Sequence, residues 1–391
     1  MLTDQALYGG GNPHDLWASM RRKCPVSWHV AADHDPFWAV TNYEVGMAVL
    51  ADWRTFTSTN GTFLRPNLSV PYPGAGTMLT LTDPPRHTLL RKVVRGLFDT
   101  RAAAALEDRA REIAGCLIDR AIEAGTCDFA TDIAARFPLE LTAKMLGIAD
   151  CDVDRMLELT GAAADNILDI DGIEAQQAHL EVLQYYAGVI AARRKCPRHD
   201  LVSAFTQAQA GGYDISDEEI ILACDNVIVA SSETTRHVVS LGLLALIERP
   251  ALWQSLRRGE VSFATAVEEI LRWAPAVNHI LRTATQDTEL ADVQIRAGDP
   301  VSVWIPAMNR DDDAFERSGE LILGRNPNRH ATFGAGRHFC LGAPLARLMI
   351  RVLLEELSHR TSEVMLDGPP RRVPSYITAG LYSLPIAVRP N

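Results

Sequence analysis

The chain has 391 residues, of which 47% are apolar, and a formal net charge of −11 at pH 7. This acidic balance argues against nucleic acid and against an anionic membrane surface as partners. The length has room for two or three domains, but the candidate functional residues are spread between positions 87 and 347. Because these residues have to converge, we predict a single domain over residues 1–391, with a core large enough to hold a cofactor.

The seven cysteines stand at scattered positions and include no C-x-x-C pair. Such an odd, dispersed set is typical of a reduced cytosolic protein rather than of a disulfide framework. The stretch from Met1 to Pro13 is polar and lacks the apolar core of a signal peptide. The longest nearly apolar run, Val238 to Ile247, is too short to span a bilayer. We therefore expect a cytoplasmic protein without a membrane anchor.

Short β-prone segments come first in the chain. The residues from Val26 to Val30 alternate between apolar and polar, and those from Phe37 to Thr41 also favour a strand. Residues 58–77 are rich in glycine, proline, serine and asparagine, which predicts a loop. A loop of this length inside a compact domain is usually functional.

A helix is predicted to begin at Asp83-Pro84-Pro85, because proline suits the first turn of a helix. His87 and Arg91 follow four residues apart and therefore share one face. Two such groups can together hold a carboxylate. An isolated pair of basic residues at this spacing is also typical of a solvated basic face.

Between residues 100 and 200 the apolar pattern is helical. One stripe, which ends before Gly125, consists of Leu106, Ala110, Ile113, Leu117 and Ala121. A second stripe, which precedes a basic turn at residues 193–200, consists of Leu180, Leu183, Tyr186 and Ile190. This part contains no catalytic constellation, and we interpret it as scaffold.

The longest predicted helix begins at a capping box, with Ser216 at the N-cap and Glu219 at N3. Its pattern continues to Glu248 and is ended by Arg249-Pro250. About 30 residues at ~1.5 Å each give a helix of roughly 45 Å. The centre, residues 230–235, is polar between apolar flanks, and burying such groups costs a few kcal/mol unless they find partners. The cluster is either a satisfied polar patch at a kink or an acid and an alcohol that deliver protons in catalysis.

Glu269 and Arg272 form an E-x-x-R pair at i,i+3, which by itself is an ordinary ion pair within a helix. After Ala274-Pro275 the chain turns extended, and Val301 to Ile305 alternates as a strand. Residues 309–330 form a coil, and the stretch from Val373 to Val388 is β-like. The whole pattern predicts a mainly α fold with small β-sheets, of the α+β class.

The densest motif is Phe333-Gly334-Ala335-Gly336-Arg337-His338-Phe339-Cys340-Leu341-Gly342, and a helix is predicted after it from Ala343 to Leu354. Its glycines allow the backbone to approach a bulky group closely, and the helix start stabilises a thiolate. Such a thiolate can attack a substrate, react with oxidants or ligate a metal. The aromatic residues and glycines favour ligation beside a flat cofactor, and a cysteine thiolate is one of the axial ligands of haem iron.

Residues from Phe333 to Arg347 resemble the cysteine-ligand signature of the cytochrome P-450 family, F-G-x-G-x-H-x-C-x-G-x-x-L-A-R, at every fixed position. An inert buried cysteine is the alternative interpretation of this loop. The resemblance extends over five motifs in the order of the family. It implies the cytochrome P-450 fold of soluble bacterial members, with a long central helix over a buried haem b, and it implies that Cys340 ligates the iron.

The same resemblance implies further contacts with the haem (iron-protoporphyrin IX). Residues that match positions holding the haem propionates are His87, Arg91, Arg282 and His338. The remaining implied cofactor contacts are Ala230, Phe333, Gly334, Gly342 and Ala346. Glu269 and Arg272 match a buried structural pair that supports the cysteine loop.

The polar centre of the long helix is similar to the family motif A-G-x-[DE]-T. The match gives Glu233 as the acid and Thr234 as the alcohol that support protonation of oxygen. Ser231 stands where the family usually has glycine, so an additional hydroxyl lies beside the oxygen-binding groove. Water order and substrate fit at that point are open.

Asn226 and Ala230 precede Thr234 by eight and four residues and share its helix face. Asn226 is therefore the leading candidate for a polar substrate contact, and a structural amide is the alternative. The full set of expected substrate-pocket residues is Asn226, Ser231, Val277, Asn278 and Thr378. If the layout of the family holds, the loop at 58–77 covers the pocket and residues 160–185 flank it.

The resemblance implies a haem-thiolate monooxygenase that activates O₂ with two electrons from a ferredoxin and its reductase. Its substrate is expected to be a medium-sized, partly polar organic metabolite, most often hydroxylated, with a role in secondary metabolism. Two alternatives remain. A peroxide-using, isomerising or oxidative-coupling enzyme often lacks the acid and the alcohol, and a non-catalytic haem carrier or sensor does not need them. An acidic ferredoxin is expected to dock on a set of basic residues, namely Arg86, Lys92, Arg95, Arg101, Arg337, Arg347 and Arg351.

Overall fold

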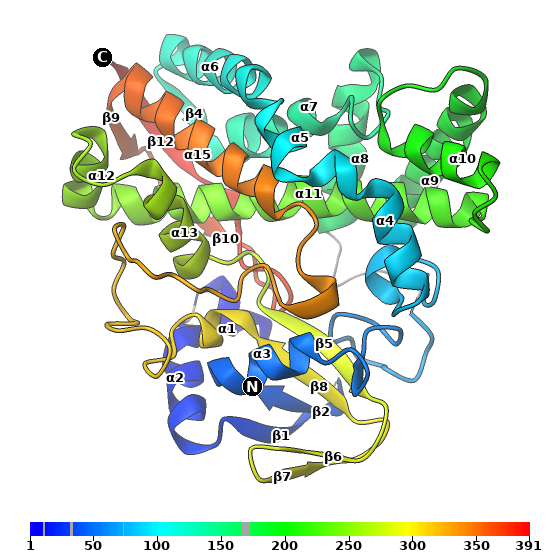
Figure 1. Ribbon diagram of the computed structural model, residues 1–391. Helices are drawn as coiled ribbons and strands as arrows, with labels where there is room; N and C mark the ends of the chain where they lie inside the picture. The colour runs from blue at the N-terminus through cyan, green and yellow to red at the C-terminus, as the bar shows by residue number, and fades with distance from the viewer. Residues whose placement is uncertain (11, 32–33, 73, 166–172) are drawn as a thin grey trace.

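The computed structural model describes residues 1–391 except 11, 32–33, 73 and 166–172. Helices fill one half of the molecule, and most of the strands lie in the other half (Figure 1). This arrangement confirms the mainly α fold with small sheets.

The helices in the N-terminal half of the chain are α1 Gln5–Gly9, α2 Pro13–Lys23, α3 Tyr43–Ala51, η1 Leu79–Leu81, α4 Arg86–Phe98, α5 Thr100–Ala104, α6 Glu107–Ala124, η2 Phe129–Ala135, α7 Arg136–Thr142, η3 Asp150–Asp152, α8 Val153–Asp165 and α9 Ile173–Lys195. Those of the second half are α10 Leu201–Ala210, α11 Asp217–Ile247, α12 Pro250–Arg257, α13 Phe263–Trp273, α14 Ile305–Met308, η4 Gly336–His338 and α15 Ala343–Arg360. Local signals set several of these ends: Gly125, for example, ends α6 in a left-handed conformation with φ 77°.

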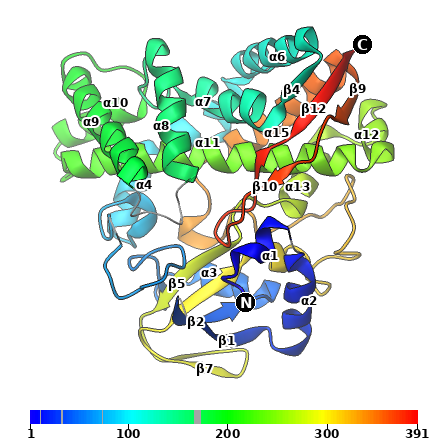
Figure 2. The same ribbon diagram turned by 180° about the vertical axis from the view of Figure 1, so that it is seen from behind.

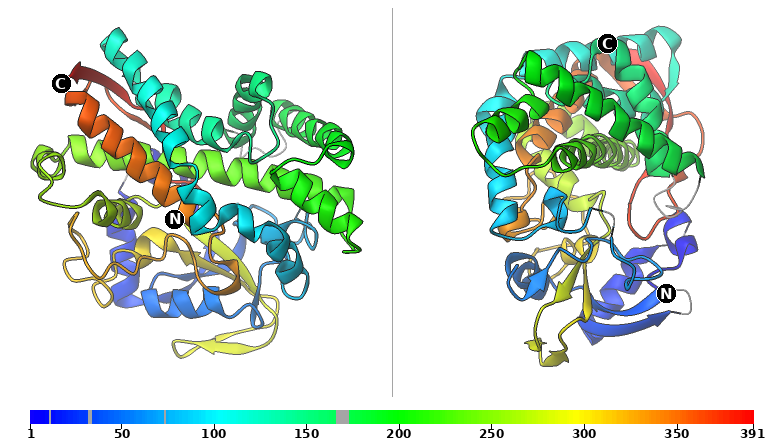
Figure 3. Two further views of the ribbon diagram at one scale, coloured as in Figure 1. Left: turned by 45° about the horizontal axis from the view of Figure 1, so that its top comes forward. Right: turned by 90° about the vertical axis from the view of Figure 1, so that its right-hand side faces the viewer.

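Helix α11 crosses the full width of the helical half (Figures 1 and 2). In the end-on view of Figure 3, other helices surround it on several sides, and α7, α9 and α15 are among its neighbours. The predicted capping box is confirmed, because the Ser216 side chain accepts a hydrogen bond from the backbone of Glu219, whose side chain accepts one from the backbone of Ser216. Among the described helices, none combines the length and the apolar character needed to cross a bilayer.

The largest sheet has five strands in the order β1 Val26–Ala31, β2 His34–Val40, β8 Pro300–Trp304, β5 His279–Ala284 and β3 Phe56–Thr57. Strands β2 and β8 are parallel and the other neighbours are antiparallel. The predicted strand from Val301 to Ile305 ends one residue earlier, at Trp304. Ile305 instead begins α14, because Pro306 fits a first helical turn and cannot donate to a sheet.

The remaining strands form small sheets, namely β4 Thr126–Asp128 with β12 Pro385–Pro390 and β9 Thr361–Leu366, then β6 Thr288–Leu290 with β7 Val293–Ile295, and β10 Arg371–Arg372 with β11 Leu381–Ser383. The prediction of β structure from Val373 to Val388 was therefore only partly right. Strands β11 and β12 occupy its second half, whereas residues 373–380 form a loop.

The predicted apolar stripe of α9 was wrong at its first position, because the Leu180 side chain is 55% exposed. The buried residues are Ala178, Val182, Tyr186 and Ile190, which follow one another at intervals of four. Residues at i and i+4 lie on one helix face, and this face packs towards α8, α10 and α11. Leu180 lies about half a turn away from that row. Of the segment 160–185 that was expected to flank the pocket, residues 166–172 lie outside the described residues.

Candidate active site

The loop that carries Cys340 lies below the middle of α11 and precedes α15 (Figure 1). Its backbone closes on itself, because the Cys340 N–H donates to the Phe333 carbonyl at 2.9 Å. Gly334 and Gly336 both have a left-handed backbone, with φ of 68° and 66°. At Gly336 a Cβ would lie 2.8 Å from the Cα of Ala51, so the loop also requires glycine for its close approach to α3.

The Cys340 sulfur is surrounded by groups that favour negative charge. Burial raises the pKa of the Cys340 thiol above its ordinary value, and the backbone N–H groups of Gly342 and Ala343 and the guanidinium groups of Arg91 and Arg347 offset only part of this rise. A metal that binds such a sulfur deprotonates it outright, and these donors and charges then stabilise the thiolate. The site therefore fits a thiolate ligand.

The other predicted residues of the loop support its shape. Phe333 is 9% exposed, and the Arg347 guanidinium lies over its ring at 4.6 Å from the centroid. Gly342 occupies the N-cap of α15, and Ala346 packs against the main core on the first turn of that helix.

His87 and His338 come together from α4 and η4, with their ring centroids 4.3 Å apart. His87 is 2% exposed and its Nδ1 has no hydrogen-bond partner among the described residues. Burial, His338 and Arg91 lower the pKa of His87 to about 4. A buried nitrogen without a partner is costly, and an anionic oxygen beside it would satisfy it.

Arg282 on β5 is 4% exposed, and its guanidinium donates to the Leu281 carbonyl at 2.8 Å. Burial lowers the pKa of Arg282 to about 10, although the carboxylate of Asp83 acts in the opposite direction. Arg91 donates to the Phe339 carbonyl at 2.7 Å and thereby joins α4 to the cysteine loop. These two cations and the two histidines form an under-satisfied, partly buried set, which fits the two carboxylates of a haem.

Asp83 belongs to this set but was not predicted as a site residue. Its Oδ1 lies 3.2 Å from His338 Nε2, and its carboxylate accepts hydrogen bonds from the hydroxyls of Thr57 and Ser58. Burial would raise the pKa of Asp83, but the hydrogen bonds from His338, Thr57 and Ser58 outweigh it and the pKa is lowered. Asp83 thus orients His338. The only signal in the sequence was its position before two prolines, which indicated a helix start and not a partner for histidine.

The polar centre of α11 combines satisfied hydroxyls with one open face. Thr234 donates to the Ala230 carbonyl at 2.7 Å, and Ser231 and Ser232 both donate to the Ile228 carbonyl, at 3.2 and 2.8 Å. Ala230 is nevertheless exposed in the middle of a helix whose flanks are buried. This exposure indicates open space beside Ala230 and Thr234, as a cofactor and a substrate require. The additional hydroxyl of Ser231 is bonded to its own helix.

The Glu233 carboxylate faces two cationic or hydrogen-bonding neighbours on its own helix. Its Oε2 lies 3.4 Å from Arg236 Nη1 and 3.6 Å from His237 Nε2, and its side chain is 14% exposed. His237 is buried, and burial together with Arg236 lowers the pKa of His237 to about 3. The imidazole is therefore neutral at pH 7. Arg236 provides the positive charge that holds the Glu233 carboxylate.

The predicted substrate residues differ in how deeply they are buried. Val277 and Thr378 are brought together in an isolated β-bridge, and Asn226 is half-buried on α11. Asn278 is 1% exposed, and its amide donates to the Ser375 carbonyl at 3.0 Å. The Asn278 amide therefore connects the start of β5 to the C-terminal loop.

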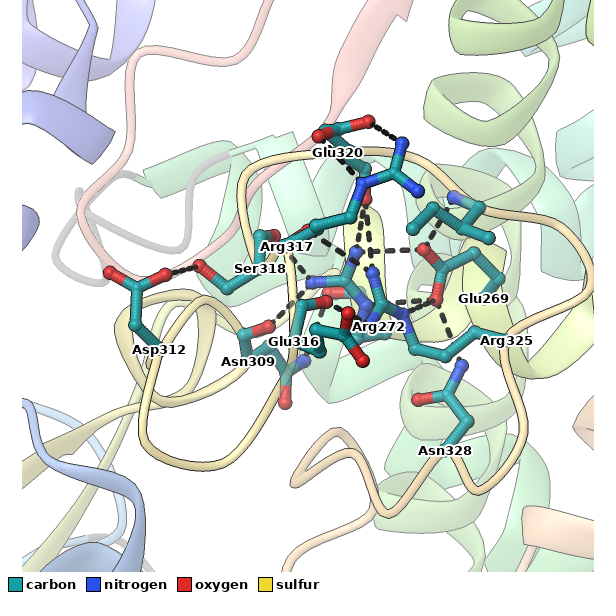
Figure 4. A network of polar contacts seen from close by, with 11 residues as sticks. Glu269, Arg272, Asn309, Asp312, Glu316, Arg317, Ser318, Glu320, Arg325 and Asn328 are labelled. Atoms are coloured by element: carbon teal, nitrogen blue, oxygen red, sulfur yellow. Dashed lines mark hydrogen bonds and ion pairs between the residues drawn. The ribbon is translucent and has the colours of Figure 1, made fainter.

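Glu269 and Arg272 form a fully buried pair on α13, as the resemblance implied (Figure 4). Arg272 Nε and Nη2 donate to Glu269 at 2.8 and 2.7 Å. The same guanidinium donates to three carbonyl groups of the following coil, those of Asn309, Ser318 and Glu320. Glu269 also accepts from Arg325 and Asn328. The pair thus holds together the coil that leads into the cysteine loop.

Comparison with known proteins identifies the family of this chain. A family model described as Cytochrome P450 matches residues 263–362. A Mycobacterium tuberculosis protein named Putative cytochrome P450 126 is 34% identical over 401 residues, which cover 99% of this chain and 97% of that protein. The chain belongs to the cytochrome P450 family.

Two further comparisons agree with this family. Mycinamicin IV hydroxylase/epoxidase from Micromonospora griseorubida is 35% identical over 335 residues, which cover 85% of this chain and 84% of the relative. The crystal structure of P450 OxyD, which is described as involved in the biosynthesis of vancomycin-type antibiotics, covers 100% of both chains with a TM-score of 0.92 and 34% identity. The protein is thus a P450 monooxygenase with the P450 fold, and this fold binds haem (iron-protoporphyrin IX), O₂ and a small-molecule substrate.

Proposed function

We propose that this P450 inserts oxygen into a medium-sized organic metabolite of secondary metabolism, most often by hydroxylation, with two electrons from a ferredoxin and its reductase. The acid and the alcohol at the centre of α11, Glu233 and Thr234, carry this proposal, and Figure 1 shows α11 above the loop that precedes α15. An enzyme that uses peroxide or only carries haem has no need of this pair. The antibiotic biosynthesis named for OxyD and the hydroxylation or epoxidation of mycinamicin IV named for the other relative support the choice of substrate class.

Haem held by Cys340 supplies binding and reductive activation of O₂, because thiolate ligation favours O–O cleavage. The residues of the chain have to supply protons and exclude other reactions. Thr234 donates its own proton to the Ala230 carbonyl, so its oxygen lone pairs can accept a proton-donating water in the open space beside Ala230. The Glu233 side chain is 14% exposed, so it can take up a proton from solvent water and pass it towards this hydroxyl by rotation, while Arg236 holds its carboxylate in the resting position.

The roles of Glu233 and Thr234 can be tested in the holoenzyme with O₂, ferredoxin, reductase and a substrate. In Thr234→Ala we expect product formed per electron pair to fall about tenfold or more and the release of hydrogen peroxide to rise, because the loss of one acid–base group costs about 10²–10⁴-fold in proton transfer. Thr234→Ser should restore coupling. Ser232→Ala is the matched control, since the Ser232 hydroxyl is buried and bonded to Ile228.

Other results would favour one of the two alternative functions. If hydrogen peroxide alone drove turnover, with equal rates in the wild type and in Thr234→Ala, the peroxide-using alternative would replace the proposal. If neither electron source gave any product with a ligand that binds, a haem carrier or sensor would remain. Candidate substrates are found by screening a metabolite library for ligands that change the visible spectrum of the haem.

Only some of the seven basic residues proposed to bind the ferredoxin are free of acidic partners within the residues that the structure describes. Three of the seven predicted residues are paired with acids of the chain, because Arg86 binds Glu219, Arg347 binds Glu268 and Arg351 binds Glu107. The four that remain exposed, which we call the basic docking surface, are Lys92, Arg95, Arg101 and Arg337. They lie on α4, α5 and η4, around the cysteine loop.

Steering by this surface predicts that the rate of reduction falls as salt rises. Arg337→Gln should weaken this salt dependence and slow reduction at low salt. Arg296→Gln is the control, since Arg296 is exposed next to β7, in a different part of the fold. A reduction rate that does not change with ionic strength would contradict an electrostatically docked ferredoxin.

We place the reaction in the cytoplasm, where thiols stay reduced, because all seven cysteines of the chain are free.

A further inference from the structure

A cavity of about 340 Å³ is lined by no residue of the cysteine loop and by none of residues 230–235 of α11. It is lined by the N-terminal helices, the end of α11, the segment after α13 and the C-terminal loop, and Figure 2 shows α1, β10 and α13 close together in this region. The lining residues include Tyr8, His14, Trp17, Leu244, Trp273 and Arg310. Ligand pockets of proteins have volumes of this size.

Arg310 places a positive charge in this cavity. Its guanidinium lies 3.9 Å from the centroid of the Trp273 ring, and its Nε is buried without a hydrogen-bond partner in the described part of the chain. Burial and the charges of Arg272, Arg21 and Arg249 lower the pKa of Arg310 to about 9, so it is still charged at pH 7. A half-buried cation without an anion, with one buried nitrogen unpaired, is costly, and the cavity is therefore suited to a negative group.

The acids near the cavity are engaged elsewhere. Glu248 lines the cavity, but its carboxylate lies 3.4 Å from Arg249 Nη1. Glu269 is occupied by Arg272 and Arg325. In the described ranges, Arg310 forms no ion pair with any carboxylate of the chain.

Two further nitrogen atoms in the wall lack partners. Trp17 is 1% exposed and its indole Nε1–H donates to none of the described residues. His14 Nδ1 is also buried without a partner there, and burial with Arg310, Arg21 and Arg372 lowers the pKa of His14 to about 2. An indole N–H can only donate, so it too requires an acceptor that the described residues do not supply.

We propose that this cavity binds a small amphipathic carboxylate, whose anionic end pairs with Arg310 and whose apolar body lies against Tyr8, Trp17 and Leu244. A guanidinium matches the planar geometry of a carboxylate. The apolar side chains of Trp17, Leu244 and Trp273 in the wall favour an organic acid over inorganic phosphate. Arg372 lies at the rim and attracts the anion. Asn278, which was expected in the substrate pocket, lines this cavity instead, and no residue of the cysteine loop or of positions 230–235 does, so this ligand is distinct from a substrate beside Ala230.

The test is a calorimetric titration of the holoenzyme with 4-phenylbutyrate, after the haem site has been saturated with a tight azole ligand. We expect saturable binding of one equivalent and no change in the visible spectrum of the haem. The uncharged analogue 4-phenylbutan-1-ol should bind at least tenfold more weakly. Inorganic phosphate tests the simple anion, and we expect it to bind more weakly than the carboxylate.

Arg310→Gln should weaken binding of 4-phenylbutyrate about tenfold or more, whereas Arg296→Gln should leave it unchanged. If Arg310→Gln does not fold, Arg372→Gln at the exposed rim is expected to fold and to weaken binding two- to threefold. The proposal is overturned if no saturable binding is found, if the alcohol binds as tightly as the acid, if the azole abolishes binding, or if the arginine variants that fold bind as the wild type does.

Discussion

Two glycines of the cysteine loop adopt the same left-handed backbone but differ in their surroundings. A Cβ added at Gly334 would have no neighbouring atom within 4 Å, whereas at Gly336 a Cβ would lie 2.8 Å from the Cα and 2.9 Å from the carbonyl oxygen of Ala51. Backbone atoms of a helix cannot move aside as a flexible side chain can. Gly336 therefore fixes how closely the loop approaches α3, and Gly334 fixes only the direction of the chain.

This difference predicts unequal effects of alanine. Gly334→Ala should lower the free energy of unfolding by about 1–2 kcal/mol, the cost of a left-handed non-glycine residue. Gly336→Ala adds a backbone clash to the same cost, so it should be clearly worse and should also weaken haem retention. Urea unfolding and the haem content of the purified variants measure both effects. Equal losses in the two variants would contradict the requirement for close approach.

The buried pair Glu269–Arg272 offers a second prediction for single residues. Arg272→Met removes one of the two cations that face the buried Glu269 carboxylate; Arg325 remains beside it, so we expect a loss no larger than the roughly 3–5 kcal/mol that a fully uncompensated buried charge costs. Because the same guanidinium holds three carbonyl groups of the coil, haem retention should fall too. Arg317→Met is the control in the same coil, since Arg317 pairs with Glu320 at 59% and 54% exposure and exposed pairs contribute about 0–1 kcal/mol. Similar unfolding midpoints for the two variants would show that the buried pair is not structural.

Helix α11 is the element on which the site depends, and its start is set by one side chain. Ser216 accepts from the Glu219 N–H at 3.1 Å, and Glu219 in turn binds Arg86 at the start of α4. The N-cap therefore also positions the helix that carries His87 and Arg91.

Ser216→Ala is expected to lower the free energy of unfolding by about 1 kcal/mol, because it leaves a donor of the first turn without its acceptor. Ser255→Ala serves as the control, since the Ser255 hydroxyl donates to the Leu252 carbonyl within α12 and caps no helix start. Chemical denaturation followed by far-UV circular dichroism measures the difference. A loss in Ser216→Ala no larger than that in Ser255→Ala would contradict the capping role.

The elements that could be predicted are those with local signals. The start and end of α11 depend on residues within a turn of each end, and the same is true of α4 and of the cysteine loop. The position of Leu180 could not be predicted, because several helical stripes fit its segment and only packing against other helices decides between them. The role of Asp83 depends on His338, which lies 255 residues later, so no local pattern could reveal it.

Across the whole molecule, buried histidines link stability to pH. His14, His237 and His279 come from α2, α11 and β5, and burial lowers their pKa values to about 2, 3 and 4. His279 is held neutral by its contacts, because its Nε2 accepts from the Leu64 N–H at 2.8 Å and its Nδ1 lies 3.0 Å from the Tyr376 carbonyl. In the unfolded chain these groups return to the ordinary value of about 6.5.

The sign of the effect follows from where protons bind. Below about pH 6.5 the unfolded chain binds protons that the buried histidines of the folded chain do not, so acid favours unfolding. This stability is fully present above about pH 6.5 and is lost as the pH falls towards the lowered pKa values of about 4 and below. His179 acts in the opposite direction, since its hydrogen bond with Asp225 raises its pKa. It is a single group and offsets only part of the loss.

We therefore expect the free energy of unfolding to fall between about pH 6.5 and 4.5, with a limiting slope of about 1.4 kcal/mol per pH unit for each buried histidine. The carboxylates of Glu107 and Glu268, whose pKa values are lowered to about 2, contribute below this window. Urea unfolding at several pH values measures the slope. His14→Gln should reduce this slope by the contribution of one group, about 1.4 kcal/mol per pH unit. Substitution of the exposed His359 by glutamine should leave the slope unchanged. Because three separate elements each contribute a buried neutral imidazole, a flat profile would mean that these histidines are protonated in the folded protein, and the packing around all three would have to be different.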